Sequence, residues 1–191
     1  MKLIKTSLVF TFLFISTLMV APVAALATTL NYTISGTGSG SLDGTSFSNA
    51  EFTFSLTGDS ENLSSNILNP LDSATFSIAG VGSGTFHLAT RIGAIGSVVF
   101  FSRGSGLDLF DFFTDATADL SSAFTVSGTG GAFALNQFND VATSAGALGF
   151  DSASGITFSS EALPPVPLPA TAWMLFAGLG GLAAFKRRKT A

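Results

Sequence analysis

Residues 30–34 read LNYTI, residues 52–56 read FTFSL and residues 76–78 read FSI. In each stretch an apolar residue alternates with a polar one. Because successive side chains of a β-strand point to opposite faces of a sheet, this period of two buries one set of side chains and exposes the other. Large apolar residues also stand two positions apart at residues 86–88, 124–126, 133–135, 148–150 and 156–158. These stretches therefore predict β-strands.

Turn-forming residues separate the predicted strands, as in LDGT at residues 42–45 and TGDS at residues 57–60. Residues 98–101, VVFF, form a continuous apolar run that predicts a strand buried on both sides. Roughly ten short strands at regular spacing indicate an all-β fold, an antiparallel β-sandwich or jelly-roll-like domain over residues 28–163. Fifteen phenylalanines lie in this region and can supply a core without disulfides, since the chain has no cysteine.

Two kinds of segment leave the secondary structure open. Asp108, Asp111, Asp115 and Asp119 recur at helix-like spacing, so residues 108–120 could form a helix. The same stretch could be a strand over residues 107–113 followed by an acidic loop, which is the interpretation we favour. Glycine-rich elements recur at residues 35–40, 80–84 and 127–131. They lack the spacing and the following helix of a dinucleotide-binding loop, so we expect turns or bulges there.

Charge is distributed very unevenly along the chain. Between the two hydrophobic ends lie only two basic residues, Arg91 and Arg103, but all 12 acidic residues, so this part has a formal charge of −10. Such a domain repels a phosphate backbone, and the sequence therefore argues against nucleic acid as a partner.

The first 27 residues have the three parts of a secretory signal peptide. Met1–Lys5 is basic, Ser7–Val20 is continuously apolar, and Ala25 and Ala27 are small residues at the −3 and −1 positions of a cleavage site. We expect signal peptidase to cut after Ala27. The alternative is an uncleaved membrane helix, but the apolar run is shorter than the ~20 residues that span a bilayer easily.

Residues 164–191 also have three parts. A proline-rich stretch, PPVPLP at residues 164–169, is followed by an apolar run at residues 170–185 and by the basic cluster Lys186, Arg187, Arg188 and Lys189. As a helix the 16 apolar residues rise about 24 Å, enough for a short transmembrane helix with its basic end in the cytoplasm. A buried helix of a soluble domain is the alternative, but three glycines would weaken it and it has no polar face.

Val166, Pro167, Leu168, Pro169 and Ala170, followed by the apolar run and the basic cluster, resemble the VPLPA variant of the PEP-CTERM sorting signal. This resemblance covers the tail only. It implies recognition by an exosortase, an integral-membrane cysteine protease of Gram-negative bacteria, and cleavage near the proline motif. It also implies a final location at the cell surface or in the extracellular matrix, in a family associated with exopolysaccharide and biofilm production.

The sequence offers little for catalysis. His87 is the one histidine, sits on the polar side of a predicted strand, and is not accompanied by a nucleophile elbow for a Ser-His-Asp triad. Paired carboxylates could hydrolyse glycosides, but sequence alone selects no pair. We therefore predict no catalytic or cofactor-binding residues. Calcium is the most plausible ligand, at residues 59–62 or in the Asp108, Asp111, Asp115 and Asp119 series, with an ordinary solvated turn as the alternative.

Together these features predict a non-catalytic surface or matrix protein, handled by signal peptidase and an exosortase-type protease and in contact with exopolysaccharide. Two alternatives stay open at this point. The domain could be a carbohydrate-binding or carbohydrate-active module, or it could remain permanently anchored in the membrane.

Overall fold

The structure is a computed structural model that describes residues 28–65 and 67–162. In this part of the chain the protein is all-β and antiparallel, as the alternation predicts, with two short 3-10 helices as its only helical elements. The strands are β1 (Thr29–Leu42), β2 (Thr45–Asp59), β3 (Leu68–Ile78), β4 (Gly82–Thr85), β5 (Thr90–Ile95), β6 (Val98–Arg103), β7 (Asp108–Phe113), β8 (Phe124–Ser127), β9 (Val141–Thr143) and β10 (Gly146–Ala162). The 3-10 helices are η1 (Ser60–Asn62) and η2 (Leu135–Gln137).

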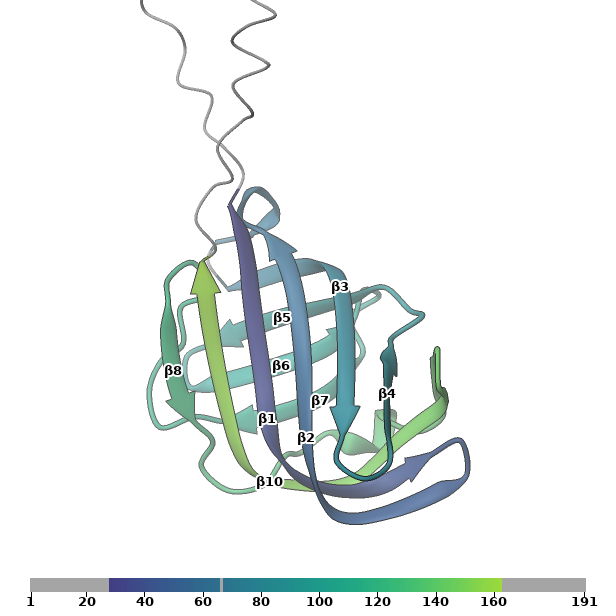
Figure 1. Ribbon diagram of the computed structural model, residues 1–191. Helices are drawn as coiled ribbons and strands as arrows, with labels where there is room; N and C mark the ends of the chain where they lie inside the picture. The colour runs from purple at the N-terminus through teal and green to yellow at the C-terminus, as the bar shows by residue number, and fades with distance from the viewer. Residues whose placement is uncertain (1–27, 66, 163–191) are drawn as a thin grey trace, which may run out of the picture.

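The strands form one curled sheet in the order β7-β6-β5-β3-β2-β1-β10-β8, with β4 beside β3 and β9 beside β10. Figure 1 shows the curl as two layers, in which the long strands of the first layer run roughly across β5, β6 and β7 of the second. Strand β3 joins the layers, because Leu68–Pro70 pairs with β5 while its later residues pair with β2. Single bridges from Thr114 to Gly128 and from Asp111 to Phe133 bring the other ends of the layers together.

The first layer has a polar outer face, as the period of two predicts. Its registers place two cross-strand rows of hydroxyl side chains side by side. One row contains Thr85, Thr75, Ser55, Thr33, Ser159 and Thr125, and the next contains Ser83, Ser77, Thr53, Ser35, Thr157 and Ser127. The residues between them, such as Ile34, Phe54 and Phe76, point inward and are buried.

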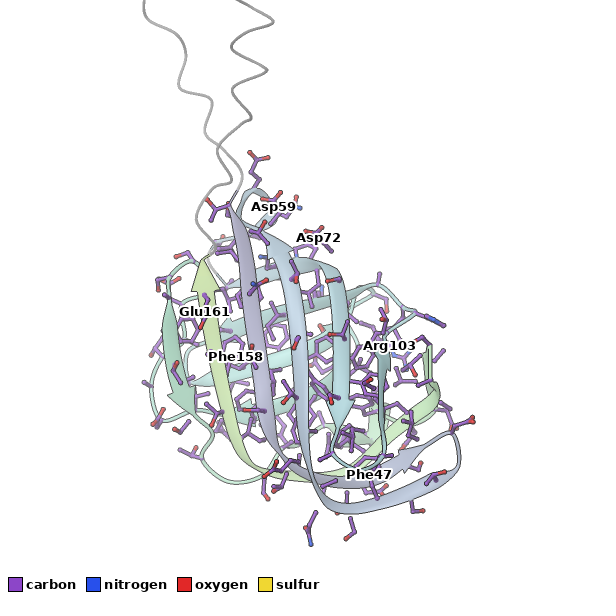
Figure 2. The ribbon with its side chains drawn as sticks, viewed as in Figure 1. Phe47, Asp59, Asp72, Arg103, Phe158 and Glu161 are labelled. Carbon is purple, nitrogen blue, oxygen red and sulfur yellow. The ribbon has the colours of Figure 1, made fainter. Side chains whose placement is uncertain are left out.

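Phenylalanine dominates the core between the layers. Figure 2 labels two of these residues, Phe47 and Phe158. Of the 15 phenylalanines in residues 28–163, 11 are buried. They are Phe47, Phe52, Phe54, Phe76, Phe86, Phe101, Phe110, Phe112, Phe138, Phe150 and Phe158. Most of their close pairs are edge-to-face or tilted, the geometries that the ring quadrupole favours over a face-to-face stack. The rings thus supply the burial that stabilises the fold without disulfides.

Several strands differ from the sequence-based predictions. The three longest, β1, β2 and β10, have 14, 15 and 17 residues, because the glycine-rich residues 35–40 continue β1 through bulges. Residues 133–135 are not a strand, since Phe133 makes a single bridge and η2 begins at Leu135. Phe86 also makes only one bridge, and His87 lies in the bend that follows it.

The ambiguous acidic segment is resolved as the strand β7 followed by a loop, not as a helix. The turn predicted at residues 42–45 is present as a two-residue hairpin. Asp43 and Gly44 have φ values of 49° and 78°. Two positive φ angles are the requirement of a type I′ turn, which glycine and aspartate meet most easily. The turn predicted at residues 57–60 begins later, because β2 continues to Asp59.

The buried hydroxyl of Tyr32 connects β1 by hydrogen bonds to Asn69 of β3 and to the loop that contains Leu120. The hydroxyl of Tyr32, which is fully buried, donates to the backbone oxygen of Leu120 at 3.2 Å. The same hydroxyl accepts a hydrogen bond from Asn69 Nδ2 at 2.9 Å, so its single proton is available for Leu120. Burial raises the pKa of the Tyr32 phenol, so the hydroxyl keeps its proton as a donor.

Tyr32→Phe is expected to lower the free energy of unfolding by about 1–2 kcal/mol, because it leaves buried partners of the hydroxyl unpaired. Denaturant unfolding of both proteins measures the difference. Ser77→Ala, which removes an exposed hydroxyl from the outer face of β3, serves as the control and should stay within about 0.5 kcal/mol of the wild type. Equal midpoints for Tyr32→Phe and the wild type would contradict the role given to this hydroxyl.

Candidate functional site: the outer face of β5, β6 and β7

The outer face of the second layer carries apolar side chains, whereas the outer face of the first layer is polar. Cross-strand registers place its residues in three rows. The middle row is Leu68, Gly93, Phe100, Asp111 and Phe133. One neighbouring row is Ile95, Val98 and Phe113, and the other is Pro70, Arg91, Ser102 and Asp108. We call the first two rows the apolar face and the third row its polar rim.

Large apolar side chains of this face are open to solvent. Ile95 is 60% exposed, Phe113 is 50% exposed and Phe133 is 37% exposed. The rings of Phe113 and Phe133 pack against each other, with centroids 5.0 Å apart and planes tilted by 31°. Contiguous exposed apolar surface is uncommon on soluble domains and marks sites of interaction.

Phe100 lies flat across the neighbouring strand. A methyl group added to Gly93 would collide with the ring of Phe100, so the glycine on β5 leaves the space that the ring occupies. Val98 and Phe100 are therefore half-buried on the outside, while Val99 and Phe101 point into the core. The prediction that residues 98–101 are buried on both sides is wrong, because no described element covers the outward side of β6.

Asp111 lies in the middle row, between Phe100 of β6 and Phe133. Its backbone is held by two hydrogen bonds with Phe133, from Asp111 N at 3.2 Å and to Asp111 O at 2.8 Å. The side chain is only 6% exposed, and its Oδ1 has no hydrogen-bond partner among the described residues. Burial, and secondly the charge of Asp108, raise the pKa of this carboxyl to about 7.

Arg91 brings the positive charge of the polar rim. Its Nε donates to Ser102 Oγ at 2.9 Å, across the β5–β6 pair. Its guanidinium lies beside Gly106 in the β6–β7 turn, where an added methyl would come within 2.9 Å of Nη2. The apolar face thus includes a buried acceptor, the carboxyl of Asp111, in its middle row, and it is bordered by a donor held in place, the guanidinium of Arg91.

The residues that sequence reasoning selected for chemistry are not brought together. His87 is exposed, as predicted, but lies in a bend and not on a strand. Asp59, Asp115 and Asp119 each accept a backbone hydrogen bond close by, from Glu61, Ser127 and Ser121. Within residues 28–65 and 67–162, no three side chains of His, Cys, Asp or Glu are grouped so as to hold a metal ion. The calcium hypothesis gains no donor set from this part of the chain.

The predicted processing residues lie outside the described residues. They are Ala25 and Ala27 of the signal cleavage site, Val166, Pro167, Leu168, Pro169 and Ala170 of the sorting motif, and Lys186, Arg187, Arg188 and Lys189 of the basic cluster. The described part contains no helix that is long and apolar enough to cross a bilayer.

Sequence reasoning missed the apolar face. Phe112 and Phe113 are adjacent in the sequence, so one of the two must point outward in a strand, and this was the available signal. The pattern of residues 133–135 predicts a separate strand that contains Phe133, and nothing in the sequence pairs this residue with Asp111. No protein-family model, no curated protein and no solved structure matches the chain.

Proposed function

We propose that the chain is an exported protein of the cell surface or extracellular matrix, with a non-catalytic β-domain sorted through its tail. The observation that carries the proposal is the pairing of a signal-peptide sequence at residues 1–27 with a VPLPA-type tail at residues 164–191, one at each end of a self-enclosed domain. In this proposal Ser7–Val20 is the signal helix, and residues 170–185 form a transmembrane helix with the C-terminus in the cytoplasm.

The arrangement of the domain supports this route. Leu30 pairs with Ala162, so the junctions to both terminal segments lie at the same end of the molecule (Figure 1). The proposed removal of the N-terminal segment and the proposed membrane attachment through the C-terminal segment therefore both take place at this end of the domain. The apolar face, on the opposite layer from the paired β1 and β10, stays available to the surroundings.

Acidic residues gather at this end. Asp59, Glu61 and Glu161 belong to or follow strands that end there, and Asp72 projects nearby (Figure 2). While the chain is anchored, these carboxylates are repelled by any anionic lipid head group on the side of the membrane that the domain faces. We infer that the domain stands away from the bilayer and leaves the proline motif accessible to a membrane protease.

Intact-mass measurement of the protein released from the cell surface tests the proposal. We expect a chain that begins at Thr28 and ends near the proline motif, without the basic cluster. Replacement of Pro167 and Pro169 by alanine, which leaves the β-domain untouched, should keep the tail attached and the protein in the membrane fraction. Surface material that still ends at Ala191 would contradict exosortase processing and favour a permanent anchor.

A further inference from the structure

We propose that the apolar face binds a neutral polysaccharide, with a pyranose ring lying on Phe113 and Phe133 and its hydroxyls reaching Asp111. This inference deepens the exopolysaccharide part of the proposed function, and it does not depend on cleavage of the tail. The juxtaposition that carries it is an exposed aromatic pair beside a buried carboxylate oxygen without a partner.

The aromatic pair fits the apolar side of a sugar. Axial C–H groups of a pyranose form a weakly positive surface, and the face of an aromatic ring is negative, so the two attract while both lose water. Phe113 and Phe133 belong to different segments and pack at an offset with centroids 5.0 Å apart, and because both remain exposed, together they offer more aromatic surface than one ring. Ile95 and Val98 continue this platform along the row of Phe113.

The carboxylate fits the hydroxyl edge of the same ligand. A buried acceptor without a partner is costly, and it gains free energy when a donor arrives. The carboxyl of Asp111 is such a group, at the register position next to Phe133: its Oδ1 is enclosed and has no partner, and a sugar hydroxyl would meet the carboxyl at the 6% of the residue that stays exposed. Arg91, held by Ser102 on the polar rim, can donate to an oxygen farther along the chain of sugars. A sugar polymer carries both hydroxyl donors and oxygen acceptors, so it can satisfy both groups at once.

Charge disfavours two other occupants, an anionic ligand and a second copy of the chain. Residues between the two hydrophobic ends carry a formal charge of −10, and Asp108 and Asp111 lie on or beside the apolar face. A second copy of the chain would bring the same acids against this face, which opposes self-association. Acidic polysaccharides and anionic lipid are repelled for the same reason.

The test titrates the full chain, kept in a detergent without a sugar head group, with four neutral hexasaccharides of the cellulose, laminarin, mannan and starch types. We expect at least one to bind, and we expect Phe113→Ala and Phe133→Ala each to weaken its affinity by about tenfold or more, as for a central aromatic contact. Leu107→Ala is the matched control, because Leu107 is also 50% exposed but lies outside the three rows. Its affinity should equal that of the wild type.

Asp111→Leu separates binding from folding. This variant removes an unsatisfied buried carboxyl, so its thermal midpoint should not fall, while its affinity for the hexasaccharide should decrease by about tenfold. The inference is overturned if none of the four hexasaccharides binds, or if the Phe113→Ala and Asp111→Leu proteins bind as tightly as the wild type. It is also overturned if sedimentation shows a dimer that Phe113→Ala dissociates.

Discussion

Replacing Phe54 with alanine is expected to lower the free energy of unfolding by about 3–5 kcal/mol, the range for removal of a buried aromatic ring. Phe54 is fully buried on β2 and stands at the centre of the core. Six other rings have centroids within 6.0 Å of its own: Phe52, Phe86, Phe101, Phe110, Phe138 and Phe150. They come from both layers, so no single strand can move to fill the cavity.

Such a loss is a large share of the total stability, because domains of this size unfold with about 5–15 kcal/mol. Denaturant unfolding of the two proteins measures it. Phe54→Leu should recover part of the loss, since most of the volume remains. Phe113→Ala, which removes the same side chain from an exposed position, should cost less than about 1 kcal/mol. A similar cost for Phe54→Ala and Phe113→Ala would show that the two rings are not buried as described.

Asp111→Asn is expected to remove a pH dependence of stability between pH 5 and pH 8. The pKa of Asp111 is about 7 in the folded protein and near 3.8 in the unfolded chain, because burial and Asp108 disfavour the charged form. Between these two values the folded state binds more protons than the unfolded state. The wild type therefore becomes less stable as the pH rises from 4 to 7, and the loss is complete above pH 7.

The size of this effect is about 1–3 kcal/mol, lower than a full conversion of the pKa difference, because solvent at the edge of the face screens the charge. Asp108, on the same strand, is the charged group that acts on the pKa of Asp111. On the neighbouring strands, Arg91 of β5 and Arg103 of β6 lie two and three residues along from the row of Asp111, and residues 131–134 contain no titratable group. Asparagine has no proton to lose in this range, so residue 111 of the variant should contribute equally to the free energy of unfolding at pH 5 and at pH 8.

Unfolding curves at pH 5 and pH 8 for the two proteins measure the difference. Asp119→Asn is the control. Hydrogen bonds from Ser121 lower the pKa of Asp119, so this carboxyl is ionised throughout the range and its replacement should leave the difference between pH 5 and pH 8 unchanged. If Asp111→Asn retains the pH dependence of the wild type, the carboxyl of Asp111 is not the group that titrates.

The strands were predictable where the sequence alternates without interruption. Tyr32, Phe54 and Phe158 all point into the core, as the period of two required. Strand β5 was missed because Arg91 and Gly93 interrupt any apolar alternation in TRIGAI. The glycine that hides this strand from the sequence is the residue that makes room for Phe100.

The apolar face could not be predicted for a different reason. A phenylalanine that points outward looks the same in the sequence as one that points inward, and the side it takes depends on register. A bulge between Phe101 and Ser102 shifts the pairing of β6 with β7, and Asp111 contacts Phe133 across a segment that includes strand β8. Such long-range pairing is not contained in any local pattern, whereas the terminal motifs are local and were open to sequence reasoning.

The pairing of β1 with β10 sets the order in which the domain can mature. Leu30 pairs with Ala162 and Leu42 pairs with Leu148, so the first strand of the domain has its partner in the last strand. Contacts between residues this far apart in the sequence make folding slow. The chain loses conformational entropy when the two distant strands come together, and the free energy gained from their pairing comes only afterwards. If the chain is exported as proposed, it would therefore stay unfolded until β10 has crossed the membrane, and the domain would fold only after export.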